Sequence, residues 1–315
     1  MKILFIGNTR LGDAILSTSI LNYYSGSNIK VTVVCSPLTE NIYKNFPHVK
    51  NIVAVNKRKK GKHWLEVYSL LERVRWDLVI DLRNSIISRL IRKKKILRIG
   101  KLNPHEHRVE SLCNLINAKF TISPSMPNKT ISKKKALILI AEKKLVLPIL
   151  AIAPVTNWQR KNWPIENFKL LINNLMKKSK KELSFNSVII LGSEKEKERC
   201  KYLVDEIDNQ NIKNLCGSCE ISVIYALLHH CKLFVGNDSG LMHLSAATGI
   251  NTLGLFGPSK EINYRPWGKK SYFLRTDSNY EELINVKGYN RFDSSSLMKT
   301  LTVEKVLKKC YEILS

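Results

Sequence analysis

The chain has 315 residues, 44% of them hydrophobic, so it can bury two ordinary cores, and this composition excludes a disordered protein. No apolar run approaches the roughly 20 residues of a transmembrane helix, and nothing at the start resembles a signal peptide. A cytoplasmic protein is therefore expected. The formal net charge of +26 is uneven: residues 1–150 hold 28 Lys and Arg against 9 Asp and Glu, and residues 151–315 hold 24 against 17.

The basic excess is concentrated in runs at residues 57–60, 92–95 and 133–135. Such runs attract anionic lipid headgroups, phosphorylated glycolipid or nucleic acid. The alternative is a set of solvated lysine faces without a partner.

The first half alternates short β-rich runs with longer amphipathic segments. Strands are expected at 2–7, 30–35, 51–55 and 77–81, and a helix at 13–24. This alternation predicts βαβ units around a parallel sheet. A lysine-rich stretch ending in a proline then places a domain boundary between residues 147 and 148.

The second half repeats the pattern. Strands are expected at 149–153, 187–192, 233–236 and 251–256, and helices at 165–178, 195–207, 222–229 and 241–248. A last amphipathic helix at about 302–314 could pack back on the first domain. The predicted fold is α/β, with two Rossmann-like domains, 1–147 and 148–315, facing across a cleft.

The most informative local feature is the turn Gly-Asn-Asp-Ser-Gly at residues 236–240, between a buried strand and a helix. Free backbone N–H groups and the positive end of a helix make such a turn an anion site. Ser239 can cap the helix, Gly240 permits close approach of the backbone, and His243 lies one turn further. In the alternative interpretation, Asp238 and Ser239 only cap the helix and His243 is an ordinary partly buried histidine.

A second glycine-containing turn follows the first strand, at residues 7–13. Its glycines are spaced wrongly for a dinucleotide fingerprint. Asp13 could be a helix N-cap or a functional acid. The seven cysteines are odd in number and scattered, which fits reduced thiols, and no Asp-x-Asp pattern indicates a metal.

Three segments together resemble the bacterial heptosyltransferases of glycosyltransferase family 9. Residues 236–259 contain Asp-Ser-Gly-x-x-His, Ala-Ala-x-Gly and Phe-Gly-Pro-Ser in the family's order. The Gly12-Asp13 turn follows the first strand, and Lys161 opens a Lys-x-Trp-Pro-x-x-x-Phe segment. The chain departs from the family at residues 153–156, where relatives commonly have Pro-Gly, and in lacking a proline in the helix after Asp13.

The resemblance implies an inverting transferase that moves a heptose from an ADP-activated donor to a lipopolysaccharide core or lipid acceptor. The first domain would bind the acceptor and the second the nucleotide sugar. It makes Asp13 the catalytic base. The remaining implied site residues are Thr9, Arg10 and Gly12 on the acceptor side and Lys161, Glu194, Asp238, Ser239, Gly240 and His243 on the donor side. In this mechanism Lys161 reaches the donor phosphates, Glu194 contacts the donor ribose, and neither a metal nor a cofactor is required.

Two alternatives remain open at this level. A relative with the same fold could transfer another sugar, such as a hexosamine from a UDP donor, to a surface glycolipid. The charge alone also fits a nucleic-acid-binding protein, although no nucleic-acid-binding motif is present and no nucleic acid is expected as a partner. For the transferase, the basic N-terminal domain predicts peripheral contact with the inner face of the cytoplasmic membrane.

Overall fold

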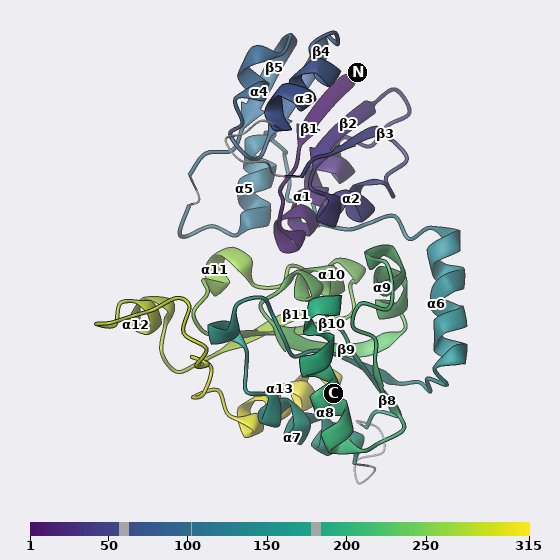
Figure 1. Ribbon diagram of the computed structural model, residues 1–315, viewed down its shortest axis with the longest axis vertical. Coiled ribbons are helices and arrows are strands. Elements are labelled where there is room, and N and C mark those ends of the chain that lie inside the picture. The colour runs from purple at the N-terminus through teal and green to yellow at the C-terminus, as the bar shows by residue number, and fades with distance from the viewer. Residues whose placement is uncertain (57–62, 102, 178–183) are drawn as a thin grey trace. The chain divides into compact units, whose positions relative to one another are not determined.

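A computed structural model describes residues 1–56, 63–101, 103–177 and 184–315, so the basic run at 57–60 lies outside the described residues. The chain divides into two compact units, Met1–Asn128 and Lys129–Ser315 (Figure 1). The expected boundary at 147/148 is therefore wrong by about twenty residues. The lysine-rich segment that suggested a domain boundary is a helix, α6 (Thr130–Glu142), and it packs within the second unit.

The first unit is a five-stranded parallel sheet in the order β3-β2-β1-β4-β5. Its strands are β1 (Lys2–Ile6), β2 (Lys30–Cys35), β3 (Val49–Ala54), β4 (Trp76–Asp81) and β5 (Lys93–Arg98). Its helices are α1 (Leu11–Tyr23), α2 (Pro37–Tyr43), α3 (His63–Leu71), α4 (Ile87–Leu90) and α5 (Arg108–Leu115). The central strands are buried because their aliphatic residues are covered by helices on both faces.

The basic run at 92–95 forms the start of β5, an edge strand that the sequence pattern did not predict. Lys94 and Lys95 are exposed there, and Lys94 pairs with Asp77 of the neighbouring strand at 2.6 Å. Charged side chains on an edge strand discourage pairing with another chain. This run therefore has a structural use besides any attraction to anions.

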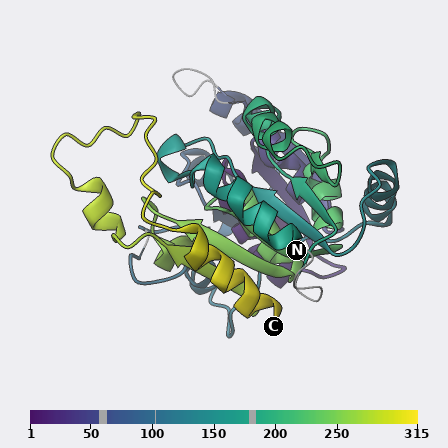
Figure 2. The same cartoon turned by 90° about the horizontal axis from the view of Figure 1, so that it is seen from below.

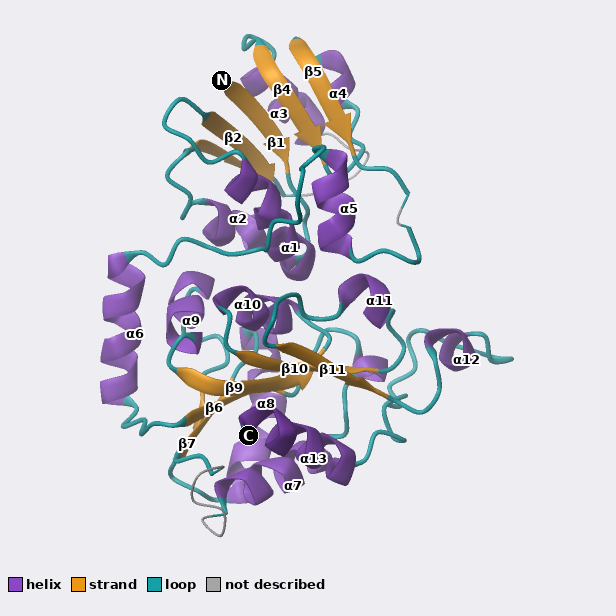
Figure 3. Cartoon of the chain, turned by 180° about the vertical axis from the view of Figure 1, so that it is seen from behind, coloured by secondary structure: helices purple, strands orange, loops and turns teal. Residues whose placement is uncertain are grey.

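The second unit is a six-stranded parallel sheet in the order β11-β10-β9-β6-β7-β8. The strands are β6 (Ile149–Ala153), β7 (Ser187–Ile190), β8 (Ile212–Asn214), β9 (Cys231–Asn237), β10 (Asn251–Phe256) and β11 (Ser271–Arg275). The helices besides α6 are α7 (Ile165–Met176), α8 (Lys197–Ile207), α9 (Ile221–Leu228), α10 (Gly240–Thr248), α11 (Glu261–Tyr264), α12 (Tyr280–Ile284) and α13 (Val303–Leu314). Figure 3 shows α7, α8 and α13 on one face of this sheet and α9 and α10 on the other.

The last helix belongs to the second unit. α13 lies beside α7 (Figure 2), and its buried residues Val303, Val306 and Cys310 join the core of the second unit. Packing of this helix against the first domain stays a prediction. Its apolar stripe is covered by the neighbouring helix and sheet.

Among the described residues, no helix is long and apolar enough to cross a membrane.

Candidate active site

The second sheet has a topological switch point between β6 and β9. From β6 the chain builds outward through β7 and β8, then returns to β9 and builds outward on the other side. Because all the strands are parallel, their carboxyl ends meet at one edge, and ligands of open α/β sheets bind where the strand order reverses. Lys161, Glu194 and Asp238 all lie in loops at this edge.

Asn237 holds the two sides of the switch point together. It ends β9 and is fully buried. Its Nδ2 donates to the carbonyl oxygen of Pro154 at 2.7 Å, and its Oδ1 accepts from the backbone N–H of Trp163 at 2.9 Å. This role of Asn237 could not be predicted from the sequence, because it requires β6 and β9 to be neighbours. It fixes the position of the loop that carries Lys161.

Lys161 and Asp238 form an ion pair at the switch point. Lys161 ends the 3-10 turn η2 (Gln159–Lys161), and its Nζ lies 3.2 Å from Asp238 Oδ2. The side chains are only 16% and 13% exposed. Burial raises the pKa of Asp238, but the charges of Lys161 and His243 outweigh burial and hold this pKa below its ordinary value. Asp238 is therefore ionised at neutral pH and orients the ammonium group.

The turn after β9 has the predicted helix-capping geometry. Ser239 is the N-cap of α10, and its hydroxyl accepts from the backbone N–H of Met242. Gly240 is the first helical residue, and His243 is buried one turn later. Asp238 does not cap the helix, because its carboxylate pairs with Lys161. The helix therefore keeps free N–H groups in its first turn beside a cation, which suits a phosphate group.

Glu194 lies after β7, on the other side of β6 from Asp238. It begins the 3-10 turn η4 (Glu194–Glu196), its side chain is 67% exposed, and it pairs with Lys197 at 3.2 Å. Gly217 has φ +68°, and a Cβ there would lie 1.9 Å from Glu194 Oε2. Residue 217 must therefore be a glycine, because a side chain there would collide with Glu194, which packs against the loop after β8. Two strand spacings, about 10 Å, separate the ends of β7 and β9, a distance that a nucleotide can span.

A segment from near the end of the chain supports the Lys161 turn. Arg160 is buried, donates to the carbonyl of Asn290, and lies over the ring of Tyr289 at 4.8 Å. The indole of Trp158 donates to the carbonyl of Arg291 at 2.9 Å. These partners lie at least 129 residues away in sequence, so no local pattern predicts them. They hold the residues that precede Lys161 in place.

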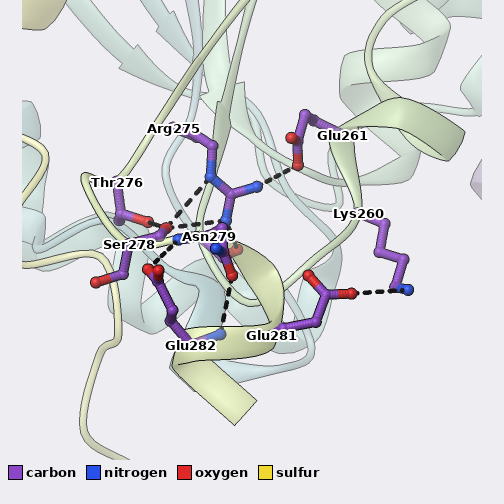
Figure 4. Close-up of polar contacts among 9 residues, drawn as sticks. Lys260, Glu261, Arg275, Thr276, Ser278, Asn279, Glu281 and Glu282 are labelled. Carbon is purple, nitrogen blue, oxygen red and sulfur yellow. Dashed lines mark hydrogen bonds and ion pairs between the residues drawn. The ribbon is translucent and has the colours of Figure 1, made fainter. Parts of the chain in front are cut away.

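A second supporting network surrounds Arg275 at the end of β11 (Figure 4). Its guanidinium donates to the Gly257 carbonyl at 2.9 Å and to the Ser278 carbonyl, and it pairs with Glu261. It thereby ties the Phe-Gly-Pro-Ser turn after β10 to the loop after β11. The side chain of Asn279 caps α12 next to it, accepting from the backbone N–H of Glu282. This network gives the family's Phe-Gly-Pro-Ser segment a structural role.

In the first unit, the glycine-containing turn at residues 7–13 lies at the carboxyl edge of the sheet, next to the switch point between β1 and β4. α1 begins at Leu11, two residues earlier than expected, and Arg10 is its N-cap without a side-chain cap bond. Asp13 is therefore the third helical residue and not the N-cap, so the alternative explanation for this residue is wrong. An acid in the first turn is favoured by the helix dipole.

The rest of this turn is held by its backbone and by neighbouring side chains. The Thr9 carbonyl accepts from the Ser36 hydroxyl at 3.2 Å, whereas the side chain of Arg10 is exposed, and Gly12 is the second helical residue.

Tyr43 is buried against Gly7, and its hydroxyl lies 3.2 Å from the hydroxyl of Ser17. Burial raises the pKa of Tyr43, and the charge of Asp13 raises it further. Thr9 and Arg10 are exposed, and Gly12 and Asp13 are partly exposed.

Six of the seven free cysteines are buried, and Cys219 is partly exposed. Within the ranges that the structure describes, no cluster of three or more His, Cys, Asp or Glu side chains is arranged to hold a metal ion.

Comparison with known proteins agrees with this geometry. The sequence model of glycosyltransferase family 9 (heptosyltransferase) matches residues 64–293. Lipooligosaccharide heptosyltransferase 2 of Campylobacter jejuni is 28% identical over 282 residues, which cover 85% of each protein.

Solved structures are similar along the whole chain. A family 9 glycosyltransferase from Veillonella parvula has a TM-score of 0.81 at 18% identity, covering 99% of this chain and 97% of that one. The E. coli ADP-heptose LPS heptosyltransferase II has a TM-score of 0.76 at 18% identity, covering 100% and 98%. These likenesses show the fold: two parallel-sheet α/β domains of the GT-B type.

The chain belongs to glycosyltransferase family 9, because the family model matches more than half of its length. It is therefore a glycosyltransferase, and the nucleic-acid-binding alternative is not favoured. The matched stretch contains Lys161, Glu194 and the turn at 236–240. The turn that contains Asp13 precedes this stretch.

Proposed function

We propose that this protein transfers a heptose from ADP-heptose to a lipooligosaccharide or lipopolysaccharide core, with inversion at the anomeric carbon. The observation that carries the proposal is the buried Lys161–Asp238 pair beside the N-terminus of α10, in a chain of this family. The similar proteins from E. coli and C. jejuni are named for ADP-heptose, lipopolysaccharide or lipooligosaccharide heptose transfer, which supports the choice of donor and acceptor.

The donor diphosphate is proposed to lie against the first turn of α10. The backbone N–H groups after Ser239, the close approach allowed at Gly240 and the Lys161 ammonium would stabilise the negative charge that grows as the anomeric bond breaks. His243 would contact the same group from one turn further along α10. The exposed carboxylate of Glu194 can accept hydrogen bonds from two ribose hydroxyls.

The acceptor is proposed to bind the first unit along Thr9, Arg10 and Gly12. Asp13 would take the proton from the acceptor hydroxyl while that oxygen attacks the anomeric carbon on the face opposite the leaving ADP. The new glycosidic bond forms as the bond to the diphosphate breaks, which inverts the configuration. Lys161 and the end of the helix supply the charge that a divalent ion supplies in other transferases.

We also propose that the enzyme works at the inner face of the cytoplasmic membrane, where a lipid-linked acceptor is embedded. The high positive charge supports this location, because each Lys or Arg near an anionic leaflet contributes about 1 kcal/mol. The attraction should weaken as the salt concentration rises, because salt shortens its range.

Calorimetry with nucleotides tests the assignment of the donor. The intact protein is expected to bind ADP and to bind UDP much more weakly. The Lys161→Met variant should bind ADP more weakly than the wild type, because the diphosphate loses its cation. Binding of UDP without binding of ADP would replace the heptose assignment with the alternative of a hexosamine from a UDP donor.

A further inference from the structure

Helix α6 stands at one edge of the second unit and contacts the rest of it mainly through α9 (Figures 1 and 3). Its buried residues are Ser132, Ala136 and Leu139. Two of these side chains are small, so α6 lies close to its neighbour while burying only a narrow stripe. Most of the helix circumference is left exposed.

The exposed side of α6 carries large aliphatic residues. Ile131, Leu137 and Ile138 are 63%, 52% and 56% exposed. Positions 131, 134, 138 and 141 follow helical spacing and therefore lie on one face, opposite the buried stripe. Single exposed aliphatic residues are ordinary, but three on one thirteen-residue helix form a patch.

Lysines lie within and beside this patch, and position 134 falls between Leu137 and Ile138 around the helix. Lys133, Lys134 and Lys135 are all exposed, and Lys143 and Lys144 follow the helix. At 100° per residue, positions 133 and 135 point about 200° apart, so their side chains border the aliphatic residues on opposite sides. Lysine can lay its alkyl stem along an apolar surface while its ammonium reaches anions. The helix itself holds one acid, Glu142.

We propose that this face of α6 is a membrane-contact surface, with Ile131, Leu137 and Ile138 entering the interface of an anionic phospholipid bilayer while the lysines bind its headgroups. Aliphatic residues interspersed with lysines on an exposed helix provide apolar contact and positive charge together, as interfacial helices do. Charge complementarity selects an anionic partner, and a bilayer supplies anions and apolar chains together.

This inference rests on the proposed function and changes the location of its membrane contact. The first unit, divided where the structure divides it, holds 22 Lys and Arg against 8 Asp and Glu, and the second holds 30 against 18. The net charges are +14 and +12, so the apparent excess in the first half came partly from the α6 region. The charge therefore does not single out the first unit as the site of membrane contact.

Cosedimentation with vesicles of phosphatidylcholine, with and without phosphatidylglycerol, tests the surface. The wild type should prefer the anionic vesicles. The Leu137→Asp/Ile138→Asp variant should bind them at least about tenfold more weakly, because it loses apolar contact and gains two repelled charges. The Lys133→Glu/Lys134→Glu/Lys135→Glu variant should lose the preference for anionic vesicles.

The matched control is Leu65→Asp/Leu70→Asp, which changes two exposed leucines of α3 in the first unit and should leave vesicle binding unchanged. Unchanged unfolding midpoints and ADP binding in all variants separate lost docking from a failure of the fold or of the proposed function. Wild-type vesicle binding by both α6 variants would overturn the proposal. So would a wild-type dimer that these variants convert to monomers, because the face would then bind a second copy.

Discussion

Asp13→Asn should lower kcat by about 10²–10⁴-fold, because a positioned general base contributes about that much to proton transfer. Donor binding should change little, since the residues proposed to hold ADP all lie after Lys129. The substitution keeps the size of the side chain and removes only its charge, which costs the first turn of α1 about 0.3–1 kcal/mol. Steady-state kinetics, with ADP calorimetry on the same preparation, measure both effects.

Glu40→Gln is the matched control. Glu40 is a partly buried acid in the first turn of α2, which follows the neighbouring strand β2 at the same sheet edge. Its loss should leave kcat nearly unchanged. If Asp13→Asn kept wild-type kcat per folded molecule while lowering the unfolding temperature, Asp13 would be a structural acid and another base would be needed.

The second large effect is expected at Lys161. Lys161→Met should lower kcat/KM by about 10²–10³-fold, the usual effect of removing one preorganised charge-stabilising group. It should also destabilise the fold by about 1–3 kcal/mol, because the carboxylate of Asp238 loses its cation in a largely buried site. Kinetics and urea unfolding measure the two losses separately.

A double variant separates these losses. Lys161→Met/Asp238→Asn removes the unpaired charge and should recover much of the stability without recovering activity. Lys169→Met is the control, because Lys169 forms a more exposed pair with Glu206 at 2.9 Å that should contribute less than about 1 kcal/mol. Recovery of activity in the double variant would show that Lys161 acts only by neutralising Asp238.

The sequence predicted the parts of the fold whose signals are local. The buried aliphatic runs of β1, β2, β6 and β10 have clear boundaries, and the turn after β9 could be recognised from its glycines and polar residues. The family's motifs contain Lys161, Asp238 and Ser239, and the structure places all three at the carboxyl edge of one sheet.

The errors have physical causes. The segment of α6 was taken for part of a domain boundary because its buried stripe is short and includes Ser132 and Ala136, whereas the rest of the helix is exposed. β5 was taken for a charged surface run because an edge strand tolerates consecutive lysines. The lysines of β5 belong to the basic run at residues 92–95 that is visible in the sequence.

The residues that support the site could not be predicted for a different reason. Asn237, Arg160 and Arg275 act through backbone groups that other loops bring to them, and these partners are defined only once the sheet has formed. A polar residue next to a recognised motif is the only local signal of such a role. Asn237 had that signal, in the turn Gly-Asn-Asp-Ser-Gly.

The most direct test of the central claim is a transfer assay followed by mass spectrometry of the acceptor. The purified full-length protein would be incubated with ADP-heptose and a lipooligosaccharide core that lacks its outer heptose. We expect the acceptor mass to increase by one heptose residue, with one ADP released per transfer and with the opposite anomeric configuration to the donor. No transfer from ADP-heptose, together with transfer from a UDP-hexosamine, would contradict the account.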